Sequence, residues 1–241
     1  MLEKVPAMAI EAEELAPAEP VGRGERNWME TVDVHAKLTE MLAQTSARHK
    51  HLCPRQVLGV RMGLYAAELF PIELPQRDKR LLALVETDGC FTDGVSVAAG
   101  CTMGRRTMRL VDHGKVAVTF VDTYDGRAIR LSPMPDARLR AAAVAPAAAS
   151  CWHAQLEAYQ VLQNEELFRL QAVQLNLDLD AIVGKPGMRV NCSACGEEIL
   201  NQREMVKDGR TICQSCAGEN YWSLMEWLSD HSKPSHSPDD S

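Results

Sequence analysis

The eight cysteines of this 241-residue chain are its most reactive side chains, and their spacing divides them into two groups. Four are dispersed: Cys53, Cys90, Cys101 and Cys151. Four form two tight pairs near the C-terminus: Cys192, Cys195, Cys213 and Cys216. In a reducing compartment such cysteines are expected to bind metals or to do redox chemistry, and structural disulfides are disfavoured. The grouping predicts two sites with different roles.

The paired cysteines have the spacing of a zinc ribbon. Cys192-Ser-Ala-Cys195 and Cys213-Gln-Ser-Cys216 are separated by seventeen residues, and Asp208-Gly209 between them favours a hairpin turn. Two Cys-x-x-Cys knuckles supply four thiolates, which close a tetrahedral zinc shell. The alternative is two redox-active dithiols, which neither pair's context favours because neither lies in a strand-to-helix turn. We therefore predict one structural zinc ion.

The segment His49-Lys50-His51-Leu52-Cys53-Pro54 places two imidazoles and a thiol at alternate positions. In an extended segment these three side chains point the same way. Pro54 suits the first position of a helix, so Cys53 lies at a helix N-terminus, where a thiolate is favoured. A thiolate binds metals and attacks electrophiles. The alternative is a helix start that carries polar residues by chance.

Cys90 and Cys101 are the further candidates for this first site. Cys90 follows Asp88-Gly89 and precedes an expected helix, and Cys101 lies in a glycine-bounded loop whose Arg105 and Arg106 would lower its pKa. Both could instead be small buried hydrophobic residues. Asp88 and Asp93 could orient a histidine or serve in turns and caps. Cys151 and His153 have no supporting context and are read as core or surface residues.

Hydrophobic periodicity predicts the elements that position these residues. Amphipathic helices are expected over 28–47 and 54–70, and in the second of these Gly59 and Gly63 would allow close packing. A buried strand is expected over 80–87, a helix from Thr92 or Asp93 to Gly100, and two strands joined at Tyr124-Asp125-Gly126. A short helix, a helix over 153–168 and a strand or helix end over 170–179 follow. We predict an α+β fold, N-terminal helices packed on an antiparallel or mixed sheet, followed by a small zinc ribbon.

Composition and charge restrict the class of protein. A net charge of −7 argues against nucleic-acid or membrane-surface binding, and no apolar run has the length of a membrane span. The first twenty residues are rich in glutamate, which is unlike a signal peptide, so a cytoplasmic protein is expected. We predict a flexible leader over 1–26, an α+β domain over 27–183, a finger over 188–222 and a disordered tail over 231–241.

The order of these motifs resembles that of the FmdE family, which is named after a component of formylmethanofuran dehydrogenase. The resemblance rests on His49-x-His51-x-Cys53-Pro54, Asp88-Gly89-Cys90, Gly100-Cys101-Thr102-x-Gly104, Gly114-Lys115 and a four-cysteine finger similar to the DksA/TraR type. It implies an α+β domain, often dimeric, with a metal site built from the His/Cys motif. Lys50 and Arg55 stand where the family usually has glycine, and these cations could favour an anionic ligand or simply be solvated.

Three functions are consistent with these motifs. The first is a metal-binding accessory protein of one-carbon or molybdenum/tungsten-enzyme metabolism, a homodimer with such an enzyme as partner. Besides structural zinc, it would hold zinc, nickel or iron through a second set of ligands, His49, His51, Cys53, Cys90 and Cys101. The second is an enzyme with Cys53 as an activated thiolate, in sulfur transfer or metal-assisted chemistry. The third is a regulator that contacts RNA polymerase through its finger.

Overall fold

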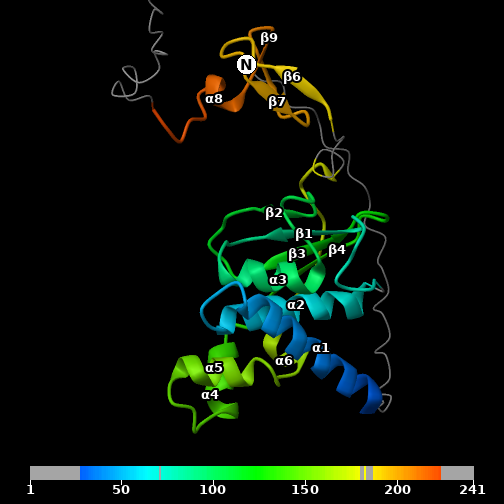
Figure 1. The fold of residues 1–241 in the computed structure, drawn as a ribbon, viewed down its shortest axis with the longest axis vertical. Coiled ribbons are helices and arrows are strands. Elements are labelled where there is room, and N and C mark those ends of the chain that lie inside the picture. Colours follow the sequence, from blue (N-terminus) through cyan, green and yellow to red (C-terminus); the bar gives the residue numbers. More distant parts are fainter. Residues whose placement is uncertain (1–27, 71, 180–181, 183–186, 224–241) are drawn as a thin grey trace, which may run out of the picture.

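The computed structural model describes residues 28–70, 72–179, 182 and 187–223. Three helices, α1 (Trp28–Ser46), α2 (Pro54–Leu69) and α3 (Cys90–Ala99), pack together beneath one five-stranded sheet (Figure 1). The shorter α4 (Ala137–Val144), α5 (Cys151–Ala158) and α6 (Asn164–Leu167) lie beyond α2. The expected α+β architecture is confirmed.

The sheet is mixed, with strand order β2-β1-β3-β4-β5. In this sheet the β1–β2 pair is parallel, and the other three strand pairs are antiparallel. The strands are β1 (Leu81–Val85), β2 (Met108–Leu110), β3 (Val118–Asp122), β4 (Ala128–Pro133) and β5 (Phe168–Val173). Every residue of β1 is buried because the helices cover one face, and Val173, Leu175, Leu179 and Ile182 pack near the other.

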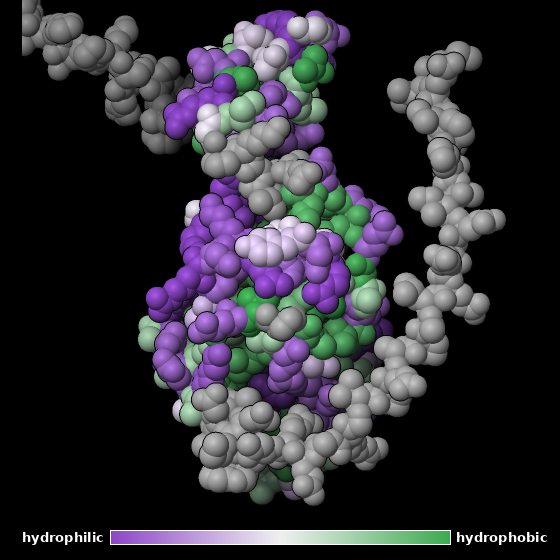
Figure 2. Space-filling model, turned by 90° about the vertical axis from the view of Figure 1, so that its right-hand side faces the viewer, coloured by the Kyte–Doolittle hydropathy of each residue, from purple (hydrophilic) through white to green (hydrophobic). Residues whose placement is uncertain are grey.

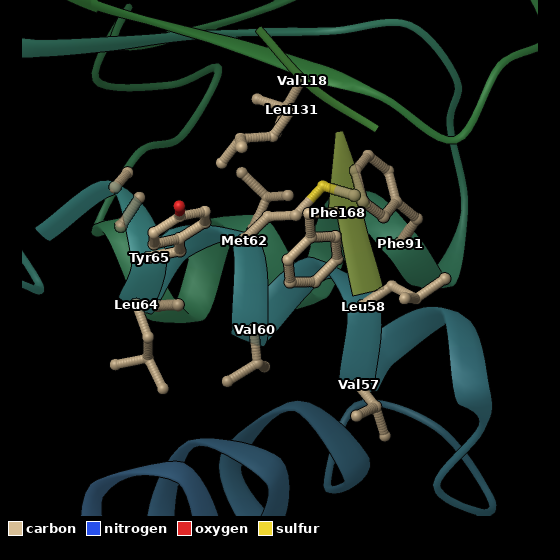
Figure 3. Close-up of a cluster of buried hydrophobic side chains, with 14 of the residues drawn as sticks. Val57, Leu58, Val60, Met62, Leu64, Tyr65, Phe91, Val118, Leu131 and Phe168 are labelled. Atoms are coloured by element: carbon tan, nitrogen blue, oxygen red, sulfur yellow. The ribbon is translucent and has the colours of Figure 1, made fainter. Parts of the chain in front are cut away.

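Helix α2 is the centre of the core. Met62 and Tyr65 are directed toward the sheet and Leu58 to the side, whereas Val57, Val60 and Leu64 are directed toward α1 (Figure 3). All six are buried. A helix that is apolar on opposite faces must be covered on both sides, so α2 lies between α1 and the sheet layer. This burial holds the N-terminus of α2, which follows Cys53, in a fixed position.

The structure corrects the bounds of two expected helices and adds one strand. Helix α3 begins at Cys90, earlier than Thr92, because Gly89 adopts a φ of +78° that turns the chain directly into the helix. The helix expected over 153–168 is divided into α5 and α6. Arg61 donates to the carbonyls of Tyr159 and Leu162 at 2.8 and 2.7 Å, which satisfies the backbone at the interruption. Strand β2 was not expected.

The C-terminal part contains two small hairpins and one short helix: β6 (Arg189–Asn191), β7 (Glu198–Leu200), β8 (Met205–Lys207), β9 (Arg210–Ile212) and α8 (Gln214–Ala217). The expected leader and tail lie outside the described residues. Among the helices that the structure describes, none is both long and apolar enough to cross a membrane.

Candidate metal centres

The four C-terminal cysteines converge on one point. Their sulfur atoms all lie within 4.8 Å of one another, and Cys195 Sγ is 3.9 Å from Cys213 Sγ. Tetrahedral zinc with bonds of about 2.3 Å requires sulfurs about 3.8 Å apart. The cysteines therefore fit a structural zinc ion, and the predicted ligand set comes together as a zinc ribbon.

Backbone N–H groups donate hydrogen bonds to sulfurs of this site, which stabilises the thiolate form that binds a cation. The N–H groups of Ala194 and Cys213 donate to Cys192 Sγ at 3.4 and 3.3 Å, and the Cys216 N–H donates to Cys213 Sγ at 3.4 Å. Amide donors, the Cys195 N–H first, lower the pKa of Cys192 to about 6. The neighbouring thiol groups, Cys213 first, raise the pKa of Cys216 to about 12. Four adjacent sulfurs cannot all ionise without a cation, which zinc supplies.

A second cluster forms where α2 and α3 begin, and glycines determine how close the two helices come. A Cβ on Gly59 would lie 2.2 Å from the Phe91 carbonyl oxygen, and one on Gly94 would lie 2.4 Å from the Gln56 carbonyl oxygen. Further along, a Cβ on Gly63 would meet Ala98. The contacts advance in the same direction along both helices, so the two N-termini lie at the same end. Cys53 and Cys90 are thereby brought together.

Three of the predicted residues lie in this cluster. Burial raises the pKa of Cys90, and the adjacent Cys53 thiol, to which it is hydrogen-bonded, raises it further. His49 Nδ1 lies 4.0 Å from Cys90 Sγ, and His49 Nε2 is 2.8 Å from Asp93 Oδ2. Asp93 thus holds the ring with Nδ1 on the side of Cys90. Among the described residues, only the finger cysteines bring three or more ligand atoms within 4.8 Å, so this cluster is looser.

Gln56 fixes the backbone around Cys53. The Cys53 N–H donates to Gln56 Oε1 at 2.8 Å, and Gln56 Nε2 donates to the Thr45 carbonyl oxygen at 3.0 Å. The Gln56 side chain is fully buried and joins the C-terminal end of α1 to the start of α2. It was not among the predicted site residues, although glutamine three positions after a helix cap is a known sequence signal.

The structure directs His51 elsewhere. Its ring centroid lies 6.1 Å from that of Trp152 at the start of α5, and Trp152 in turn meets His153 edge-on at 5.0 Å. His153 Nδ1 is 2.8 Å from Ser150 Oγ. His49, His51 and Cys53 therefore do not share one direction, because the segment turns instead of running extended. Trp152 was missed, since its contact with His51 joins residues a hundred positions apart.

Cys101 does not join the cluster. It follows the C-terminal end of α3, and ten helical residues place it about 15 Å from Cys90 at the other end. Gln76 Nε2 donates to its sulfur at 3.0 Å, and the thiol donates to the Leu81 carbonyl oxygen at 3.3 Å. Burial raises the pKa of Cys101 to about 12 and outweighs the effect of Arg105, which lowers this pKa as expected. Cys101 is a buried core thiol.

The remaining residues singled out in the sequence are Asp88, Asp93, Cys151 and His153. Asp88 is exposed, and Asp93 is the carboxylate that meets a histidine. Cys151 and His153 are exposed at the start of α5, where Ser150 caps the helix. Arg48 lies 3.6 Å from Asp93, so this carboxylate faces both a cation and the His49 ring.

Comparison with known proteins gives two family matches. The model described as "FmdE, Molybdenum formylmethanofuran dehydrogenase operon" matches residues 48–176, and "Prokaryotic dksA/traR C4-type zinc finger" matches residues 186–221. Both the cluster at α2 and α3 and the four-cysteine site lie within matched regions.

Two individual proteins are similar to parts of the chain. A "Probable S-adenosyl-L-methionine-binding protein" of Archaeoglobus fulgidus is 38% identical over 114 residues, 46% of this chain and 31% of that protein. The chain thus spans about a third of this relative's length. The crystal structure of a "tungsten formylmethanofuran dehydrogenase subunit e (fmde)-like protein" from Syntrophus aciditrophicus gives a TM-score of 0.49 at 21% identity, covering 77% of this chain and 95% of that one.

Proposed function

Because the chain belongs to the FmdE family and carries a C4-type zinc finger, we propose that it is a metal-binding accessory protein with a second metal centre at the N-termini of α2 and α3. The observation that carries this proposal is the His49–Asp93 contact of 2.8 Å, which leaves His49 Nδ1 beside Cys90. A carboxylate that binds the far nitrogen of a ligating histidine fixes its tautomer and orientation.

The donors of this second centre are Cys53, Cys90 and His49. Two thiolates and one imidazole favour zinc, nickel or iron. A metal held by three protein ligands retains a position for another ligand and can act there as a Lewis acid. The chain's own residues orient the donors: Asp93 holds His49, and Gln56 holds the Cys53 backbone. The burial of Cys53 limits the access of water to the sulfur.

The family name supports a role for this protein in one-carbon metabolism. It refers to the operon of a molybdenum formylmethanofuran dehydrogenase, an enzyme of one-carbon metabolism. We propose that the client or partner of this chain is a molybdenum or tungsten enzyme. Co-purification with such an enzyme, lost in Cys53→Ser and retained in Cys151→Ser, tests this assignment.

We also propose that the chain forms a homodimer. On the face shown in Figure 2, hydrophobic residues gather over the middle of the larger domain and hydrophilic residues surround them. Contiguous exposed apolar surface is typical of protein interfaces. Light scattering on the full chain would report a mass of twice 26.6 kDa if this proposal holds.

S-adenosyl-L-methionine is a second candidate ligand, because the Archaeoglobus relative carries that printed name. The exposed Trp152 beside the cluster favours it, since a purine ring can stack on an indole. Equilibrium dialysis of the full chain with this compound tests it. Retention that is equal in wild type and Trp152→Leu would argue against this site.

The enzyme hypothesis requires Cys53 to react. In the structure Cys53 is 9% exposed and lies beside a second thiol, which suits metal binding better than attack on a large substrate. Loss of thiol-dependent turnover in Cys53→Ser, with metal content unchanged, would favour the enzyme. The polymerase hypothesis requires co-purification that depends on the finger.

Metal counting on the anaerobically purified full chain tests the proposed function. We expect about two metals per chain in wild type and in Cys151→Ser, whose cysteine is exposed at the start of α5. Cys53→Ser and Cys195→Ser should each lose one metal, and a different one. A wild-type protein with one metal, unchanged by Cys53→Ser, would overturn the second centre.

A further inference from the structure

Two unpaired cations flank the proposed second centre. Lys50 follows His49, and Arg55 lies two residues after Cys53. Both are exposed, and among the described residues neither has a carboxylate within ion-pair distance. By contrast, Arg80 binds Asp122 and Arg130 binds Glu86. Lys50 and Arg55 lie on either side of Cys53 in the chain, so this segment of an acidic protein carries two positive charges that attract anions.

An aromatic pair, Trp152 and His51, lies beside the same segment. Trp152 is 39% exposed, and its ring lies between His51 at 6.1 Å and His153 at 5.0 Å. Figure 1 shows α5 on the same side of the molecule as the segment that joins α1 to α2. Two residues of chain span at most about 7 Å, so the His51 backbone lies within that distance of both His49 and Cys53, while its ring is directed to Trp152. The two imidazoles contact the indole, and part of the indole stays exposed.

We infer that the second centre takes a small anionic ligand with a flat ring, whose acid group is bound by Lys50 and Arg55 and whose ring packs on Trp152 and His51. This inference rests on the proposed metal centre, whose open position the ligand would approach. Cations select an acid group by charge, and an exposed indole offers a flat apolar face on which a ring stacks. The pairing of these two features selects against neutral rings and against acids without a ring.

Simple probes separate the two parts of the inference. Benzoate is flat and anionic, benzyl alcohol is flat and neutral, and cyclohexanecarboxylate is anionic without a flat ring. Calorimetric titration into the metal-loaded full chain should give the tightest binding for benzoate. We expect the other two probes to bind at least about fivefold more weakly, because each lacks one of the two contacts.

Matched variants locate the binding. Lys50→Gln, Arg55→Gln and Trp152→Leu should each weaken benzoate binding by about fivefold or more without changing the metal content. The controls are Lys79→Gln, Arg138→Gln and Trp222→Leu, which remove exposed side chains of the same types elsewhere. They should bind benzoate as wild type does.

The outcomes distinguish this inference from the proposed function. The ligand class is overturned if the protein holds two metals but binds the three probes equally. It is also overturned if Lys50→Gln and Lys79→Gln bind benzoate equally. In both cases the proposed metal centre is retained. A protein without the second metal that still binds benzoate through Lys50, Arg55 and Trp152 overturns the metal centre and retains the anion site.

Discussion

Gly59 on α2 and Gly94 on α3 lie opposite one another so closely that neither position has room for a Cβ atom. This contact has a chemical consequence, because it aligns the starts of the two helices. Cys53 and Cys90 meet there, and His49 and Asp93 complete the cluster. The geometry of the proposed metal centre therefore depends on two residues that carry no side chain.

Gly59→Ala should destabilise the domain. The new methyl group would lie 2.2 Å from a backbone oxygen of Phe91, which cannot move without displacing α3. Overpacking of this kind costs about 1–3 kcal/mol, and a gain in helix propensity of about 1 kcal/mol offsets only part of it. Urea denaturation measures the difference. Gly104→Ala is the matched control because nothing lies within 4 Å of its added Cβ, and equal losses in both variants would contradict the role of the contact.

Asp93→Asn should weaken the second metal without unfolding the protein. The amide keeps the shape of the side chain but loses the charge that orients His49 at 2.8 Å. Loss of such a partner typically lowers metal affinity about 10–100-fold. Competition with a chromophoric chelator measures the affinity. Asp88→Asn, at an exposed position in the loop before α3, should leave it unchanged. An unaltered affinity in Asp93→Asn would remove Asp93 from the centre.

Removal of zinc should unfold the finger and leave the larger domain folded. The finger's buried cluster contains only Cys192, Ile199 and Ile212, so the metal supplies most of its folding free energy. Addition of a strong chelator should collapse the amide NMR signals of β6 to β9 while those of the five-stranded sheet persist. Because protons compete for the thiolates, acidification should release the same metal. Retained finger signals without metal would contradict this account.

Asp122 should make the domain sensitive to acid. Its fully buried carboxylate accepts bonds from Arg80 at 2.7 and 3.0 Å, and Arg80 holds the pKa of Asp122 below its usual range. This stabilisation is complete above the unfolded pKa of about 3.9 and is lost as the pH falls through the lower folded pKa. Asp122→Asn should be less stable at pH 7, and its difference from wild type should shrink below about pH 4. A pH-independent difference in urea denaturation would contradict the ion pair.

Structural features that depend on local sequence pattern were predicted correctly. Pro54 begins α2 at the expected residue because proline suits the first turn, and the Cys-x-x-Cys knuckles converge because each is one tight turn. The glycines of α2 could be assigned to close packing because small residues at a spacing of four share a helix face. The partner helix could not be named from that spacing alone.

The remaining features depend on tertiary contacts. Arg105 lies near Cys101 in sequence, yet burial decides the pKa of that thiol, and burial is a property of the folded core. Instead Arg105 donates to the carbonyl oxygens of Arg77 and Asp78. His51 meets Trp152 through a fold that brings α5 beside the start of α2. Periodicity contains no information about such pairs.

The central claim is a metal bound by Cys53, Cys90 and His49. X-ray absorption at the metal edge, on the full chain with the finger disabled by Cys192→Ser and Cys195→Ser, tests it most directly. We predict one bound metal with two sulfur ligands and at least one imidazole nitrogen, and the loss of one sulfur ligand when Cys90→Ser is added. A protein without metal, or a metal with only oxygen and nitrogen ligands, would contradict the account.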